Sequence, residues 1–408
     1  MKRANRRDFL FGAGALVPAG LLATRFAFAG AGPAGDVAAH DGRFVFILMR
    51  GALDGLAAVP PVGDADYARL RGPMAVAGTQ LDDTFALHPA MKFLADRYSA
   101  QELLVLHAIA TPYRERSHFD GQDILESGAA APHALQTGWL NRALAARGAG
   151  GASGVALGAN VPLVMRGPAE VGSWSPSRLA SLREETLQRF SDLYAGDSTL
   201  SARLADALAS DAVAEQAMGD EADSGADMAT GGGKRPGAAL GETLRAAAGF
   251  LRDARGARVA VIETTGWDTH ANEGGSEGAL AQRLGALDAA LGEFRTAMGG
   301  AWDRTAVLLA TEFGRTAASN GTRGTDHGTG AAAFLVGGAV AGGRVLADWP
   351  GLAPGALYQG RDLMPTRDLR AVLKGVLHDH LQVGDRSLDA DVFPGSAAVR
   401  REQGLLRG

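Results

Sequence analysis

The chain contains no cysteine among its 408 residues. It can therefore form no disulfide bond, and it has no thiolate to act as a nucleophile or as a metal ligand. Any metal site in this protein must be built from Asp, Glu, His and hydroxyl groups. Stability outside a cell must come from the hydrophobic core or from a bound ion.

Three other features that the sequence lacks make three classes of function improbable. The net charge is -5 and no dense stripe of Lys and Arg occurs, so we do not expect nucleic acid as a partner. Beyond the N-terminal segment no stretch of roughly 18 uninterrupted apolar residues follows, so we expect no stable membrane anchor. No G-x-G-x-x-G motif lies between the first expected strand and its helix, which argues against a nicotinamide-dependent oxidoreductase.

The N-terminus carries the most specific local signal. The segment MKRANRRDFL contains the pair Arg6–Arg7, and a short, mildly apolar stretch follows that ends in A-F-A before Gly30. This pattern is typical of a twin-arginine (Tat) signal peptide over residues 1–29. It predicts recognition by the Tat translocon and a periplasmic or secreted location. The competing interpretation is a basic amphipathic helix.

Hydrophobic residues make up 46% of the chain, which is enough for a sizeable core. Short, continuous apolar stretches are typical of strands in a parallel sheet that is covered on both faces. Five such stretches occur, at residues 43–50, 102–110, 257–265, 305–313 and 331–338. Amphipathic helical patterns lie between them, for example with Leu284, Leu287, Leu291 and Phe294 on one helix face. This alternation predicts an α/β fold: a doubly wound, mostly parallel sheet with helices on both faces.

We expect residues 30–408 to form a single α/β domain. Residues 196–240 interrupt the alternation, because they start with a helical pattern and continue as a small, acidic and Gly-rich segment. Such a composition predicts a helical and flexible insertion at the periphery.

Side chains that can bind a ligand follow almost every expected strand. In open α/β sheets, ligands bind beyond the carboxyl ends of the strands, so these side chains are expected to meet at one edge. They are Asp54 after the first strand, Ser117 and His118 after the second, Asp268 and His270 after the third, Glu312 and Arg315 after the fourth, and Asp326 and His327 before the fifth. So many carboxylates repel one another unless a cation lies between them. The pattern predicts one divalent ion or a pair, chosen from Zn, Mn, Mg and Ca.

Long motifs between residues 43 and 380 resemble one family. They include FILMRGALDGLAAVPP, RSHFDGQDILESG, WDTHAN and ATEFGRTAASNGTRGTDHGTGAAAFLVGG. With these motifs the chain resembles the exported bacterial domain-of-unknown-function family 1501, which looks like a branch of the alkaline-phosphatase-like superfamily. The resemblance implies an alkaline-phosphatase-like core and a metal-dependent chemistry on phosphate or sulfate esters.

The resemblance also implies roles for individual positions. Asp54 matches the first metal-binding aspartate of the superfamily. Asp268 and His270 match an Asp–His pair that binds one metal, and His327 matches the last histidine ligand. Ser117 stands where relatives carry a Ser or Thr nucleophile at the start of a helix.

One position departs from the pattern of these relatives. After the fourth strand they carry an Asp–His pair, whereas this chain has Glu312–Phe313, and Phe cannot bind a metal. The second metal thus loses an imidazole unless His118 or Asp326 replaces it. A two-metal site and a single-metal site both stay open, and the expected ligands are drawn from Asp54, Asp268, His270, Glu312, Asp326 and His327.

Each candidate catalytic residue also has a structural interpretation. In an enzyme, Ser117 is expected to attack the ester and His118 to protonate the leaving group. Arg315 or Arg116 is expected to hold the ester oxygens through a bidentate contact. Alternatively, Ser117 is only the N-cap of the following helix, and Arg315 only neutralises Glu312 in a buried ion pair.

These observations support two hypotheses. The first is an exported, metal-dependent hydrolase or transferase that acts on a small-molecule or glycan ester of phosphate or sulfate. The second is a non-catalytic exported scaffold that keeps the fold and binds a glycan or a protein partner. A protein partner is suggested because members of the family accompany another exported family of unknown function.

Overall fold

The structure is a computed structural model that describes residues 42–148, 154–176, 238–253 and 256–408, together with scattered positions between 190 and 213. The expected signal peptide, residues 1–29, lies outside the described residues. Most of the expected insertion at 196–240 lies outside them as well.

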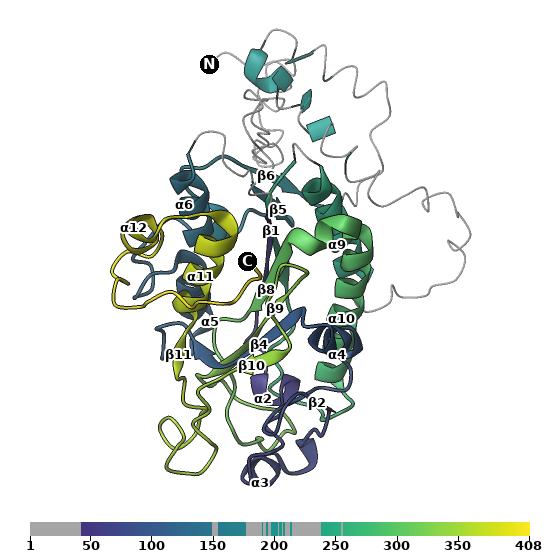
Figure 1. The fold of residues 1–408 in the computed structure, drawn as a ribbon, viewed down its shortest axis with the longest axis vertical. Coiled ribbons are helices and arrows are strands. Elements are labelled where there is room, and N and C mark those ends of the chain that lie inside the picture. Colours follow the sequence, from purple (N-terminus) through teal and green to yellow (C-terminus); the bar gives the residue numbers. More distant parts are fainter. Residues whose placement is uncertain are drawn as a thin grey trace, which may run out of the picture.

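One large sheet organises the described part of the chain (Figure 1). Its strands follow the order β10-β4-β9-β8-β1-β7-β5-β6, and β11 pairs with β4. The five expected strands are β1 (Arg43–Met49), β4 (Leu103–Ala110), β7 (Val259–Thr264), β8 (Thr305–Ala310) and β9 (Ala331–Val336). The others are β5 (Gly154–Leu157), β6 (Val171–Trp174), β10 (Arg344–Leu346) and β11 (Arg367–Asp368). A separate antiparallel pair joins β2 (Thr79–Gln80) to β3 (Ala86–Leu87).

The central strands β8, β1, β7 and β5 are parallel, whereas β9 runs antiparallel to both of its neighbours, β8 and β4. The expected mostly parallel sheet is therefore confirmed, with one reversed strand inside it. Because β9 is reversed, it begins at the edge where β8 ends. The segment 311–330 that joins them consequently stays at the carboxyl edge of the sheet.

Helices cover both faces of the sheet, as the doubly wound arrangement requires (Figure 1). The alternation of side chains along β1 sends Val45, Ile47 and Met49 to one face and Phe44, Phe46 and Leu48 to the other. The first face packs against α4 (Lys92–Ser99), α9 (Ala238–Arg252) and α10 (Ala279–Met298). The second face packs against α5 (His118–Ser127), α6 (Trp139–Ala146) and α11 (Leu369–Leu381).

The expected apolar face of α10 is confirmed, since Leu284, Leu287, Leu291 and Phe294 are all buried. Two short helices, α2 (Gly55–Ala58) and α3 (Tyr67–Arg71), follow β1 at the carboxyl edge. None of the helices in the described part of the chain has both the length and the apolar character needed to cross a bilayer.

Candidate metal centre

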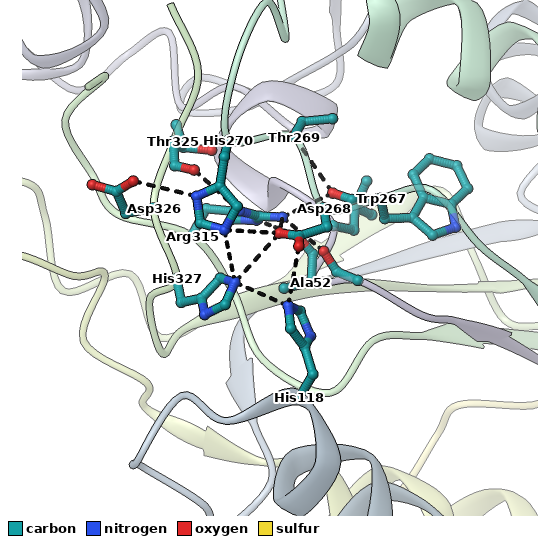
Figure 2. A network of polar contacts seen from close by, with 12 residues as sticks. Ala52, His118, Trp267, Asp268, Thr269, His270, Arg315, Thr325, Asp326 and His327 are labelled. Carbon is teal, nitrogen blue, oxygen red and sulfur yellow. Dashed lines mark hydrogen bonds and ion pairs between the residues drawn. The ribbon is translucent and has the colours of Figure 1, made fainter. Parts of the chain in front are cut away.

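Four loops meet at the carboxyl edge of the sheet (Figure 2). One follows β1, one lies between β4 and α5, one follows β7, and one joins β8 to β9. Gly51 shows how tightly they pack, because a Cβ at this position would lie 2.7 Å from the backbone nitrogen of Asp268. Its φ of 118° also lies where side chains are rarely tolerated. The side chains carried by these loops therefore face one another across short distances.

Three imidazoles converge at this edge (Figure 2). The Nε2 atom of His327 lies 2.9 Å from Nε2 of His118 and 2.9 Å from Nε2 of His270. The three histidines come from α5, from the loop after β7 and from the β8–β9 loop, so they are far apart in sequence. His118 and His327, together with Asp268, each offer one ligand atom, and these atoms lie within 4.8 Å of one another.

The opposite nitrogen of each ring faces a hydrogen-bond acceptor. His118 Nδ1 lies 2.7 Å from Glu312 Oε1, and His270 Nδ1 lies 3.3 Å from Asp326 Oδ1. His327 Nδ1 lies 3.1 Å from the Arg116 carbonyl oxygen. Carbonyl and carboxylate oxygens accept hydrogen bonds but do not donate them. In a neutral ring the nitrogen that faces such an oxygen must carry the proton, so these partners place the proton of each neutral ring on Nδ1. All three Nε2 atoms then present lone pairs to the same point.

Asp268 completes the group with a carboxylate. Its Oδ1 lies 3.1 Å from His270 Nε2 and 3.3 Å from His327 Nε2, and its Oδ2 lies 3.5 Å from His118 Nε2. Partial burial disfavours the charged form, but the Arg315 guanidinium bound to Oδ1 outweighs it and lowers the pKa of Asp268. The carboxylate is therefore ionised at neutral pH.

This donor set fits a divalent transition metal. The lone pair of His327 Nε2 lies 2.9 Å from those of His118 and His270, and such lone pairs repel unless a cation or a proton lies between them. Zinc ligands lie about 2.0–2.1 Å from the ion, so two ligands of one tetrahedral ion lie roughly 3.3 Å apart, a little farther than these nitrogens. Imidazole nitrogens suit Zn and other transition metals, whereas Mg and Ca prefer oxygen ligands. Acceptors behind the rings are the usual outer partners of metal-bound histidines.

His118 and His327 respond differently to this environment. The hydrogen bond that His118 donates to Glu312 raises the pKa of His118. Burial lowers the pKa of His327, and the positive charge of the neighbouring His118 and Arg315 lowers it further. His327 is therefore a neutral imidazole near pH 7, the form that binds a metal.

Glu312 and Asp326 were expected as metal ligands, but both lie behind the imidazoles. Glu312 is buried and accepts from His118, from the Gly51 amide at 2.9 Å and from Gln122 at 3.1 Å. Burial opposes its ionisation, yet these donors lower the pKa of Glu312. Asp326 accepts from Asn320 and lies beside His270 Nδ1. Both carboxylates thus orient histidines, and His118, expected as a proton donor, stands among the candidate ligands.

Asp54, the other expected ligand, lies apart from the imidazoles. Its carboxylate is 1% exposed and binds both terminal nitrogens of Arg71, which is itself fully buried. It also caps α2 by accepting from the amides of Leu56 at 3.0 Å and Ala57 at 3.2 Å. The guanidinium of Arg71 supplies the cation that this carboxylate needs, so no metal is required to balance its charge in this arrangement.

Arg315 does not form the expected contact with Glu312. Its guanidinium is buried, and it donates to Asp268 and to the carbonyl oxygens of Gly51, Ala52, Thr325 and Trp267 at 2.7–3.1 Å (Figure 2). These bonds join three of the four loops and hold the Asp268 carboxylate in place. Arg315 is thereby occupied with the protein itself and is not free to bind ester oxygens.

Ser117 stands at the N-cap position of α5, but its side chain makes no capping bond. Its amide and its hydroxyl both interact with the phenol oxygen of Tyr113. In the described part of the chain no hydrogen bond joins its hydroxyl to the three imidazoles or to Asp268. The residue is next to His118 in sequence, so it lies at the rim of the cluster.

Several residues of the site were not anticipated from the sequence. The Arg116 carbonyl binds His327, Gln122 binds Glu312, and Arg71 neutralises Asp54. The positive φ of 64° at Arg116, unusual for a residue other than Gly, helps to direct this carbonyl. The sequence gives no signal for these contacts, because the partners are separated by up to 211 residues in the chain.

Comparisons with known proteins give one family and several solved structures, two of which are described below. No curated protein matches the chain. One solved structure is a protein of Bacteroides thetaiotaomicron labelled 4S-sulf, from work on the metabolism of multiple glycosaminoglycans. It has a TM-score of 0.38 and 11% identity, over 89% of this chain and 75% of that one. The other is the phosphonate monoester hydrolase of Agrobacterium radiobacter, with a TM-score of 0.34 and 13% identity, over 84% and 74% of the two chains.

At these TM-scores the structural likeness carries no conclusion about activity. The family comparison is more direct, because the model described as "Protein of unknown function (DUF1501)" matches residues 41–390. That range contains all nine strands of the large sheet and every residue of the candidate metal centre. The chain belongs to the DUF1501 family.

Proposed function

We propose that this protein binds one divalent transition metal, zinc in the first place, through His118, Asp268, His270 and His327. The observation that carries the proposal is the convergence of three Nε2 lone pairs and a carboxylate, with an acceptor behind each ring. Glu312, Asp326 and the Arg116 carbonyl would keep the rings in the orientation that binds the ion.

We further propose that the bound metal serves the hydrolysis or transfer of a phosphate or sulfate ester. An ion of this kind acts as a Lewis acid toward an ester oxygen. Two cations beside the ligands support a site for the anionic part of such a substrate. Arg361, whose side chain is 47% exposed, donates to the His327 carbonyl. The second cation is the partly exposed Arg116, in the loop between β4 and α5. Both are already fixed by the buried carboxylate of Asp362.

Ser117 is the candidate nucleophile in this proposal. It precedes the ligand His118, and its hydroxyl interacts with Tyr113 at the start of α5. Attack on an ester requires the hydroxyl to leave Tyr113 and turn toward the metal centre. As the bond to phosphorus or sulfur forms, the hydroxyl proton would pass to Tyr113 only if the phenol gives its own proton to the Asp120 carboxylate, which it contacts at 3.3 Å.

The experiment starts from protein purified by its own export route. Elemental analysis should find about one zinc or similar ion per chain, and 4-nitrophenyl phosphate or 4-nitrophenyl sulfate should be hydrolysed. Ser117→Ala should keep the metal and lose turnover, whereas Asp268→Ala should lose both. A protein that holds no transition metal would refute the proposed centre. A protein that holds the metal but hydrolyses neither ester would refute only the proposed chemistry.

The pairing of the Ser117 hydroxyl with Tyr113 favours a second candidate. In this alternative the metal centre is not catalytic, and the protein is an exported module that binds a glycan or a protein partner. Phe119, which is 85% exposed beside His118, offers an apolar contact for such a ligand. Loss of ligand capture on Phe119→Ala, in a protein that turns over no ester, would favour this candidate.

A further inference from the structure

The two loops that carry three of the proposed ligands share a buried acid that none of the roles above uses. Glu273 is 0% exposed. Its Oε2 accepts a hydrogen bond from Thr269 Oγ1 at 2.8 Å and another from Thr325 Oγ1 at 2.8 Å. Thr269 lies between Asp268 and His270, and Thr325 lies two residues before His327. A single carboxyl oxygen therefore joins both ligand loops.

Backbone contacts around Glu273 show that the two loops pack as one body. The Glu273 amide donates to the Arg323 carbonyl at 2.9 Å, and the Thr325 amide donates to the Thr269 carbonyl at 3.3 Å. A Cβ on Gly324 would lie 2.3 Å from the His270 carbonyl oxygen, so only glycine permits this approach. The carboxyl of Glu273 lies in the middle of this closely packed region.

The second oxygen of Glu273 is in an unusual environment. No donor from the described residues reaches Glu273 Oε1, although the atom is buried. The buried Asp54 carboxylate interacts with Glu273 electrostatically. Two buried carboxylates in one region repel each other unless one of them carries a proton. Asp54 already accepts two bonds from Arg71 and two from backbone amides, so its charged form is well supported.

The proton therefore belongs on Glu273. One guanidinium, that of Arg71, faces two carboxyl groups in a region without solvent. If both were ionised, the region would hold an unbalanced buried negative charge. Burial and the adjacent Asp54 carboxylate raise the pKa of Glu273, which agrees with a protonated acid.

We propose that Glu273 is a neutral positioning residue. Its protonated carboxyl donates to Asp54, accepts from Thr269 and Thr325, and so sets the spacing between the loop of Asp268 and His270 and the loop of His327. It contacts no ligand directly. The metal-binding part of the inference rests on the proposed metal centre, whereas the joining of the loops does not.

Three variants of the full chain test the inference. Glu273→Gln keeps a neutral group with one acceptor and one donor, so it should leave zinc affinity within about two-fold of the native protein. Glu273→Leu removes every bond and should weaken zinc binding about ten-fold or more, as loss of an outer partner of a metal site does. Thr269→Val combined with Thr325→Val keeps the acid and should also weaken binding, even if Glu273→Leu fails to fold.

Titration calorimetry with zinc alone and hydrogen exchange of the metal-free protein give separate readouts. Exchange at the amides of residues 269–273 and 322–327 should speed up in the Leu and double Val variants but not in the Gln variant. If native protein binds no zinc, the proposed function fails, while exchange still decides the role of Glu273. Unchanged exchange in the double Val variant would overturn the joining of the loops. A Gln variant as loosened as the Leu variant would overturn the protonated state.

Discussion

The Nε2 atoms of His270 and His327 lie 2.9 Å apart, although 57 residues separate the two histidines in the chain. Behind them, Nδ1 of His270 faces a carboxylate and Nδ1 of His327 faces a carbonyl. In neutral rings these back contacts place the protons on Nδ1, and the short Nε2 separation is then unfavourable without a cation or a shared proton. The arrangement is compatible with the metal centre proposed above.

Metal binding is expected to depend on His327 and to stabilise the fold. Since zinc binds the native state, a zinc concentration of 1,000 times the dissociation constant should add about 4 kcal/mol to the free energy of unfolding. His327→Ala should abolish this gain, which thermal unfolding with and without EDTA will show. The matched control is His378→Ala on α11, where the ring contacts only exposed carboxylates. If zinc stabilised the His327→Ala variant as much as the His378→Ala variant, His327 would not be a ligand of the metal.

Glu312→Gln is expected to weaken zinc binding roughly ten- to one-hundred-fold without changing the stoichiometry. The carboxylate holds Nδ1 of His118 at 2.7 Å and increases its basicity, and an amide oxygen does so less strongly. Calorimetric titration of the folded variant measures the effect. Glu293→Gln on α10, which removes an exposed pair with Arg245, should bind zinc like the native protein. Loss of one whole metal equivalent would instead show that Glu312 is itself a ligand.

Asp54→Asn is expected to destabilise the fold without removing the metal. The change leaves the guanidinium of Arg71 buried without its charge partner, which costs about 3–5 kcal/mol in comparable buried pairs. Urea unfolding measures this loss, and elemental analysis of the folded fraction should find the native metal content. The control is Asp66→Asn, which breaks an exposed pair with Arg69 on the neighbouring helix and should cost under about 1 kcal/mol. A variant that is as stable as the native protein but contains no metal would show that Asp54 is a metal ligand.

Acid is expected to destabilise the protein partly through His107. This ring is fully buried in β4, where Nδ1 accepts from the Ala108 amide at 2.8 Å and Nε2 contacts the Val59 carbonyl at 3.1 Å. Burial lowers the pKa of His107 to about 4, compared with about 6.5 in the unfolded chain. Between these values only the unfolded state binds the proton, so the stabilising contribution present above pH 6.5 is lost as the pH falls toward 4.

The loss expected between pH 7 and pH 4.5 is on the order of 2–3 kcal/mol. Urea midpoints in EDTA, which removes the effect of the metal, will measure it. His107→Gln lacks the titrating ring, so its stability should fall less over the same pH range even if it is lower at pH 7. Parallel pH curves for the two proteins would show that His107 does not contribute.

Export is expected to depend on the arginine pair near the N-terminus. Changing Arg6 and Arg7 to Lys should keep the chain in the cytoplasm with its first 29 residues still attached, since the pair is the recognised feature of a Tat signal. Cell fractionation and mass spectrometry of the N-terminus will detect this. Arg3→Lys, which leaves the pair intact, should be exported normally. Export of the double variant at the native level would reject the Tat interpretation.

Much of the fold could be predicted because the signals for it are local. Each of the five apolar stretches forms a strand, since a short run of buried, β-branched and aliphatic side chains suits a sheet covered on both faces. The short strands β5 and β6, with four residues each, were missed because so few residues give no clear pattern. The reversal of β9 was not anticipated either, since apolarity alone does not indicate the direction of a strand.

The candidate site could be predicted only in part. Asp268, His270 and His327 were identified as ligands because polar residues follow buried strands at one edge of the sheet, and the structure brings them together. The structure places Asp54 beside Arg71, and Glu312 and Asp326 behind histidines, so a role as metal ligands stays a prediction for these three carboxylates. Their surroundings are decided by groups that approach them from elsewhere in the chain.

The sequence by itself determined the export signal hypothesis, the strands and the edge of the sheet where chemistry is expected, because apolarity and strand order act over short stretches. Tertiary structure alone decided that Arg71 neutralises Asp54, that Glu312 and Asp326 stand behind histidines, and that Glu273 lies between two threonines. The charge and proton of a buried carboxyl depend on the groups within a few ångströms of it, and in this fold those groups come from distant parts of the chain.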